Sequence, residues 1–224
     1  MGKSLIRIVE SVKEELSHYK LTDDFPITDE YLADKADDVR ASLIREAYKN
    51  KKIDEKYYQQ MCCIEIECAK PGCDVNGVNI PMDYVVWYAD LPTLVQDIGW
   101  DDIKYFGLMG FIQDFDRKSM GNWINIEGNV WTGLKPAYTI IGNRAYFKNL
   151  PTSGITFLCL VAILYKPTTA CNYQVDDEYP VPSDMTLQML MKKDILSTGF
   201  IPLPDKIHDG KAPDITDMNP GKKR

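Results

Sequence analysis

The stretch DDEYPVPSDMTLQMLMKKDIL, residues 176–196, has the pattern of a helix and follows a long segment with strand patterns. Pro180 and Pro182 impose an extended approach, and Ser183 can accept a hydrogen bond from the first free amides of a helix. Asp184 places negative charge at the positive end of the helix dipole. The sequence therefore predicts a helix that begins close to Ser183.

This predicted helix carries an apolar stripe that must pack on another part of the protein. Leu187, Leu190, Met191 and Ile195 fall at i, i+3, i+4 and i+8. Leu190→Asp should therefore unfold the bundle to which the helix belongs. After Gly199 the chain has too few large apolar residues to fold by itself. We expect this tail to become ordered only in an assembly, so that its deletion would spare the fold and harm assembly.

The first third of the chain is predicted to be helical. Apolar residues at helical spacing indicate a first helix over residues 4–20, and a second extends from a cap at Thr28 to residue 49. Asp54 can cap a third, short helix that ends at Met61. The C-terminal helix is the natural fourth member of this bundle.

The middle of the chain shows strand patterns. Alternation begins at Cys62, and Gly142-Asn143 lies between two short runs, which is typical of a two-residue hairpin. Residues 155–165 indicate a strand buried on both faces. The predicted fold class is α+β: a helical bundle with an inserted antiparallel β-rich domain and an extended C-terminal tail. The predicted segments are N-terminal helices (1–61), β-rich insertion (62–170), returning helix (171–199) and tail (200–224).

Composition indicates a globular chain. It has 224 residues, of which 45% are hydrophobic and 26% are charged, enough for one sizeable core or for one core and a smaller satellite. The net charge of −7 argues against a surface that grips phosphates, although an acidic wall can let DNA slide past. The longest apolar run, residues 155–165, is about half the length needed to cross a bilayer. We expect neither a membrane span nor a signal peptide.

No residues are predicted to be catalytic, cofactor-binding or metal-binding. Asp114 and Asp116 could hold a magnesium ion, and with Glu127 they would suit a small metal-dependent hydrolase or nuclease. Such Asp-x-Asp pairs are also common in solvated loops, which is our interpretation here. The same interpretation applies to three acids that flank Gly99 and Trp100, namely Asp97, Asp101 and Asp102. His18 and His208 lie in a helix end and in the tail, so a nucleophilic triad is not expected.

The six cysteines are expected to be free thiols, because the chain has no secretory signal and no Cys-x-x-Cys pair. A zinc site from Cys63, Cys68 and Cys73 is the alternative, but their spacing departs from the usual paired knuckles. Cys62 and Cys68 could equally fill space on one face of a strand.

The order of these features resembles the neck proteins of short-tailed bacteriophages. The similarity covers ITDEYLADKADDVRASLIREAYKNKKID (27–54), the hairpin YTIIGNRAYFKNLP (138–151), the buried strand and the capped helix at Ser183. It is strongest to the ring, or head-to-tail connector, proteins of the crAss-like phages. The tract CAKPGCDVNGVNIPMDYVVWYADLP (68–92) matches no pattern of this kind.

The resemblance implies a non-enzymatic structural component of a tailed-phage virion, assembled in the host cytoplasm and without a cofactor. Such connectors form a homo-oligomeric ring, usually twelve-fold, that docks beneath the portal protein and contacts other neck or tail rings. The genomic DNA would pass through the lumen during packaging and ejection without specific binding. Another tail or neck structural protein of the same virion is the alternative, and a hydrolase or nuclease is a further one.

Overall fold

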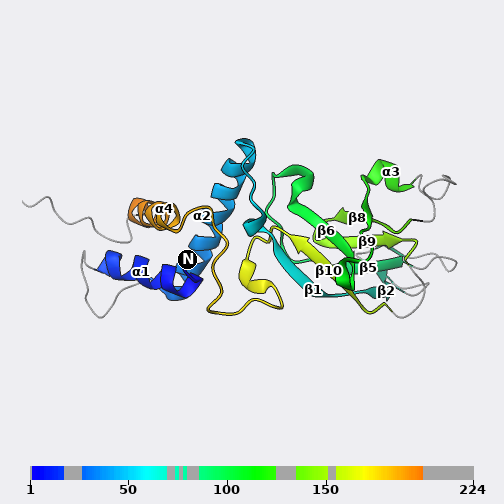
Figure 1. Ribbon diagram of the computed structural model, residues 1–224, viewed down its shortest axis with the longest axis horizontal. Coiled ribbons are helices and arrows are strands. Elements are labelled where there is room, and N and C mark those ends of the chain that lie inside the picture. The colour runs from blue at the N-terminus through cyan, green and yellow to red at the C-terminus, as the bar shows by residue number, and fades with distance from the viewer. Residues whose placement is uncertain are drawn as a thin grey trace, which may run out of the picture.

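The computed structural model shows an elongated molecule with helices at one end and sheets at the other (Figure 1). This arrangement confirms the predicted mixed α+β class. The structure describes residues 2–17, 27–69, 74–75, 78–79, 86–124, 135–150 and 155–198. The predicted tail, residues 200–224, therefore lies outside the described residues.

Three helices form the helical end: α1 (Leu5–Ser17), α2 (Asp29–Lys49) and α4 (Asp184–Ser197). The caps predicted for α2 and α4 are confirmed. The Thr28 hydroxyl accepts a hydrogen bond from the Tyr31 amide at 3.2 Å. The Ser183 hydroxyl accepts one from the Thr186 amide at 3.3 Å.

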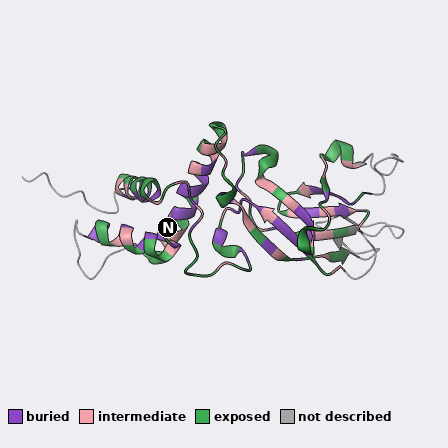
Figure 2. Cartoon of the chain, viewed as in Figure 1, coloured by how far each residue is buried: buried purple, intermediate pink, exposed green. Residues whose placement is uncertain are grey.

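The three helices share one apolar core. Each contributes fully buried side chains: Ile8 and Val12 from α1, Leu32 and Ala36 from α2, and Leu187, Met191 and Ile195 from α4. Buried positions continue along α2 toward the sheets, so this helix lies between the two ends (Figure 2). Burial of these stripes supplies most of the stability of helices this short.

The β end contains three sheets within the described residues. A three-stranded antiparallel sheet has the order β1 (Gln59–Glu65), β10 (Phe157–Ala162), β6 (Ile103–Leu108). The five-stranded sheet has the order β2 (Glu67–Ala69), β5 (Val86–Asp90), β9 (Arg144–Lys148), β8 (Ala137–Ile141), β7 (Asp116–Arg117). β3 (Asp74–Val75) and β4 (Val78–Asn79) pair with each other. One short helix, α3 (Met120–Ile124), and four 3-10 turns complete the description: η1 (Glu55–Tyr57), η2 (Gly99–Asp102), η3 (Met109–Phe111) and η5 (Pro167–Thr169).

Both predicted features of the middle segment that depend on local signals are present. The hairpin joins β8 to β9, and Gly142 has the positive φ of 62° that the turn requires. The apolar run 155–165 contains β10, which lies at the centre of its sheet. The expectation of an antiparallel domain needs a correction, because β7 pairs with β8 in parallel.

The short helix predicted from Asp54 to Met61 is wrong. The Asp54 carboxylate does accept a hydrogen bond from the Lys56 amide at 3.3 Å, but only the single turn η1 follows. The backbone is extended at Tyr58, and β1 begins at Gln59. Pairing of β1 with β10 outweighs the weak helical preference of this segment.

The expectation of free thiols is also wrong for four cysteines. Disulfide bonds join Cys62 to Cys159 and Cys63 to Cys171. The register of β1 against β10 is irregular between Met61 and Ile64, at the two adjacent cysteines. Cys62 is thereby linked to the neighbouring strand, and Cys63 to the segment that follows η5. The disulfides attach β1 to two distant parts of the chain.

The predicted packing of α4 against the core needs one correction. Leu187, Met191 and Ile195 are fully buried, but Leu190 is 37% exposed. It lines the open groove between α2 and α4 at the edge of the shared core, so Leu190→Asp is no longer expected to unfold the protein.

Replacement of Leu187 by alanine should lower the free energy of unfolding by about 2–5 kcal/mol, because the loss leaves a cavity among three packed helices. Ile112→Ala is the matched control, since Ile112 is 81% exposed and its truncation should cost no more than about 0.5 kcal/mol. Urea unfolding of both variants measures the difference. Equal losses would contradict the assignment of Leu187 to the core.

Candidate assembly surfaces

The acids considered for catalysis are engaged in structural contacts. Asp102 forms a two-point ion pair with Arg117. Asp116 lies 3.4 Å from the Lys118 ammonium. The Asp114 carboxylate accepts a hydrogen bond from the Phe106 amide at 3.2 Å.

The remaining candidates do not converge on a site. Asp97 lies 3.9 Å from Arg45, and the Asp101 carbonyl accepts a hydrogen bond from the Tyr58 hydroxyl. Glu127 lies outside the described residues. Across the described part of the chain, no group of three or more His, Cys, Asp or Glu side chains could hold a metal ion.

The zinc interpretation loses one of its ligands, because Cys63 is bonded to Cys171. Cys68 lies exposed on β2. Cys73, His18 and His208 lie outside the described residues.

Arg40 of α2 is completely buried where the two ends of the molecule meet. Its guanidinium donates to the Pro180 carbonyl at 2.6 Å and to the Leu164 carbonyl at 2.6 Å. It also lies 3.4 Å from the Tyr57 carbonyl and 3.5 Å from the Gln59 side-chain oxygen. One side chain thus holds α2 to the start of β1, to the residues that follow β10 and to the segment that leads into α4.

A second buried charge lies one turn away. Asp37 accepts a hydrogen bond from the Tyr179 hydroxyl at 2.6 Å. Burial raises the pKa of Asp37 to about 6, against the opposing effects of Tyr179 and Arg40. Burial lowers the pKa of Arg40 to about 10, so the guanidinium stays charged at neutral pH. Burial and the nearby Asp37 also raise the pKa of Tyr179, so its hydroxyl remains a donor.

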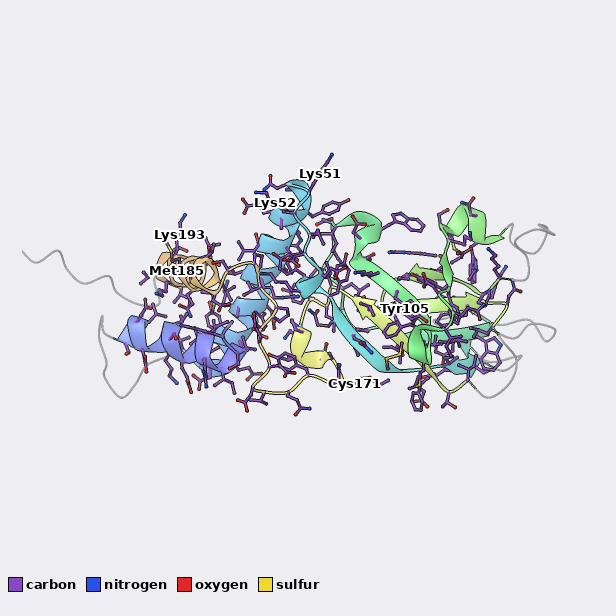
Figure 3. The ribbon with its side chains drawn as sticks, in the orientation of Figure 1. Lys51, Lys52, Tyr105, Cys171, Met185 and Lys193 are labelled. Atoms are coloured by element: carbon purple, nitrogen blue, oxygen red, sulfur yellow. A yellow bond between two sulfur atoms is a disulfide. The ribbon has the colours of Figure 1, made fainter. Side chains whose placement is uncertain are left out.

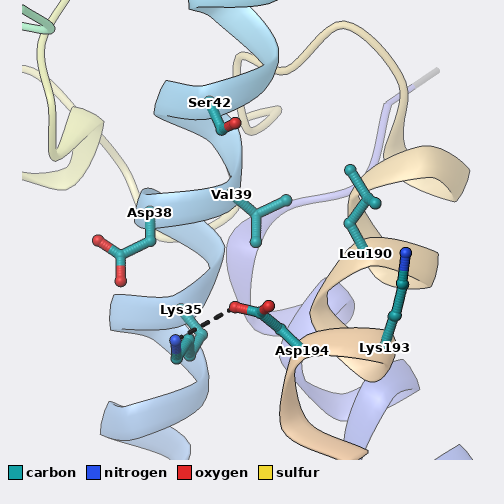
Figure 4. A pocket seen from close by; sticks show the side chains of 7 residues that line it. All are labelled: Lys35, Asp38, Val39, Ser42, Leu190, Lys193 and Asp194. Carbon is teal, nitrogen blue, oxygen red and sulfur yellow. Dashed lines mark hydrogen bonds and ion pairs between the residues drawn. The ribbon is translucent and has the colours of Figure 1, made fainter. Parts of the chain in front are cut away.

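A groove of about 280 Å³ lies between α2 and α4. Figure 4 shows Val39 and Leu190 facing it from the two helices. The Lys35 ammonium and the Asp194 carboxylate meet across it at 3.3 Å, and Lys193 lies at its edge. Only Val39 and Leu190 among its lining residues are apolar, so this open groove lacks the apolar lining of a small-molecule site.

Apolar side chains are exposed at both ends of the molecule. At the helical end, Met185 is 74% exposed and Met189 is 63% exposed on α4. At the other end, Ile112 is 81% exposed in the loop that follows β6. Neighbouring exposed apolar side chains are typical of contact surfaces.

The family of the chain was identified by comparison with known proteins. Residues 7–199 match the family of crAss-like phage proteins described as phage tail ring protein 2. The chain belongs to this family. It is therefore a structural ring protein of a phage tail and a component of the virion, as the resemblance had implied. No curated protein matches the sequence.

This ring protein has no membrane-spanning helix among the described residues, because none of those helices is both long and apolar enough. Its match ends at residue 199, one position beyond the described end of the helical core.

The sequence did not reveal the junction at Arg40. Asp37 and Arg40 stand three residues apart on α2, among the apolar positions Ala36 and Val39. Charged residues at buried helical positions were the available signal, because a charge in an apolar stripe needs a partner. The identity of the partners could not be read from it.

Asp37→Asn should remove a pH dependence of stability between about pH 4 and pH 6. In the unfolded chain this carboxyl group ionises near its ordinary pKa of 3.8, whereas in the folded ring protein it stays protonated up to about pH 6. The folded state therefore binds more protons in this window, and rising pH favours unfolding. Relative to Asp37→Asn, the wild type should lose stability across the window and change little above it.

Urea unfolding of both proteins at pH 4, 5, 6 and 7 measures this difference. A difference that is constant with pH, or a wild type that gains on the variant as pH rises, would contradict the burial of this carboxylate.

Proposed function

We propose that the chain forms a closed homo-oligomeric ring that docks beneath the portal protein and extends the channel through which DNA leaves the capsid. The ring would contain twelve subunits and act as a head-to-tail connector without enzymatic activity. The family match over residues 7–199 is the observation that carries this proposal.

The structure supports an architectural role through its contacts. The acids that could have served catalysis are used in ion pairs and backbone hydrogen bonds, such as Asp102 with Arg117 and Asp114 with the Phe106 amide. The exposed apolar side chains of α4 are instead suited to contacts between subunits, and those of the loop at Ile112 to contacts with other parts of the tail. The three helices with their shared core would form the bundle, and the β end would be a domain inserted between α2 and α4.

The charge of the chain suits a channel for DNA. A net charge of −7 leaves few clustered cations to hold phosphates, so duplex DNA could pass during packaging and ejection without specific binding. We place the ring in the neck, in contact with the portal and with other tail rings, after assembly in the host cytoplasm. Residues 200–224 would become ordered against a neighbouring subunit.

Native mass spectrometry and electron microscopy of the purified chain test the proposal. We expect a closed ring with a mass about twelve times that of the 25.6 kDa subunit, formed by the chain alone or on addition of the portal protein. The same phage's portal should bind it coaxially, whereas an unrelated ring protein should not. A chain that stays monomeric with and without the portal protein would contradict ring formation. A ring that does not bind the portal protein would contradict only the proposed docking beneath the portal.

A further inference from the structure

The outward side of α4 is unusual for a surface helix. Its inward side supplies Leu187, Met191 and Ile195 to the shared core, yet Met185 and Met189 on the opposite side are 74% and 63% exposed. Met185, Met189 and Lys193 stand at i, i+4 and i+8 and so form one stripe. Figure 3 shows Lys193 on the side of α4 away from α1. We call these three residues the α4 stripe.

The outward side of α1 carries a matching pattern. Ile6 is 48% exposed, and Glu10 and Glu14 follow at i+4 and i+8, also exposed. Arg7 lies beside them and is exposed too. We call Ile6, Glu10 and Glu14 the α1 stripe. Both stripes have an apolar first position, and their last positions are oppositely charged.

The charged members of both stripes are available for a partner. Neighbouring charges are already paired: Lys13 with Asp29, and Lys192 with Glu15. Within the described residues, no ion pair reaches Glu10, Glu14 or Lys193. An apolar and acidic face on one side of the helical end therefore complements an apolar and basic face on the other.

A closed ring of more than two copies requires such a pair of faces. Its contacts are heterologous, so each subunit presents two different and mutually complementary surfaces. α1 and α4 pack against each other in the shared core, and each stripe lies on the exposed side of its own helix. With helix axes about 10 Å apart, the pair is roughly 20 Å thick, and twelve such units would close at a diameter of about 75 Å.

We infer that the α1 stripe of one copy packs against the α4 stripe of the next copy around the ring. Met185 and Met189 lie over the region of Ile6, and Lys193 pairs with the acids of the neighbouring α1. This inference rests on the proposed ring, and it assigns the helical end to the contact between subunits. The apolar loop at Ile112 takes no part in that contact.

The first test introduces a charge at an exposed apolar position. Met189→Glu would place a carboxylate against Glu10 of the neighbour, so it should raise the concentration needed for assembly at least tenfold. The matched control is Ile112→Glu, which adds the same charge at the other end of the molecule and should assemble as the wild type does. Sedimentation velocity of the full chain measures assembly, and circular dichroism verifies the fold of each variant.

The second test exchanges the charges. Glu14→Lys and Lys193→Glu should each weaken assembly, and the double variant should recover most of the loss, because the ion pair is restored with reversed polarity. Recovery in the double variant supports the inference. Additive losses in the double variant would overturn the inference. Weaker assembly of Ile112→Glu with normal assembly of Met189→Glu would also overturn it. Neither result would contradict the proposal that the chain forms a ring. A wild type that forms no ring would instead overturn the proposed function.

Discussion

The buried guanidinium of Arg40 is the constraint on which the arrangement of this ring protein depends. Three segments far apart in the sequence turn carbonyl groups toward it, at Tyr57, Leu164 and Pro180. A buried charge is tolerated only when its donors are satisfied, so these segments are held where they can satisfy them. Together with the apolar contacts along the same helix, this side chain of α2 fixes the helical end to the β end.

This junction explains how the chain can build an assembly. Because the inner sides of α1, α2 and α4 are used in the shared core, and α2 is tied to the sheets, the outer sides of α1 and α4 keep a defined orientation. A ring closes only when the angle between successive subunits is constant. The disulfides from Cys62 and Cys63 add to this rigidity, because they attach β1 to β10 and to the segment that leads back toward α4.

The features that the sequence predicted are those set by neighbouring residues. The caps at Thr28 and Ser183 and the turn at Gly142 each depend on a few adjacent positions, and all three are present. Family membership followed from the order of such local patterns.

The features that the sequence did not predict depend on distant partners. Arg40 meets a carbonyl 140 positions away, and the disulfides span 97 and 108 positions. The segment after Asp54 became a strand because β10 pairs with it, which its helical preference could not show. The assembly surfaces could likewise not be predicted from the sequence. Met189 is exposed and Met191 is buried, although both are methionines on the same helix.

Two-probe unfolding of wild type, Arg40→Met and Arg45→Met tests the coupling most directly. All four tryptophans lie between residues 87 and 131, so their fluorescence reports the β end, and far-ultraviolet circular dichroism reports mainly the helices. The two transitions should coincide in the wild type and in Arg45→Met, whose side chain is only partly buried. In Arg40→Met they should separate, with stability lower by about 3–5 kcal/mol. Separate transitions in the wild type, or an Arg40→Met variant that behaves as Arg45→Met does, would contradict the central role of this junction.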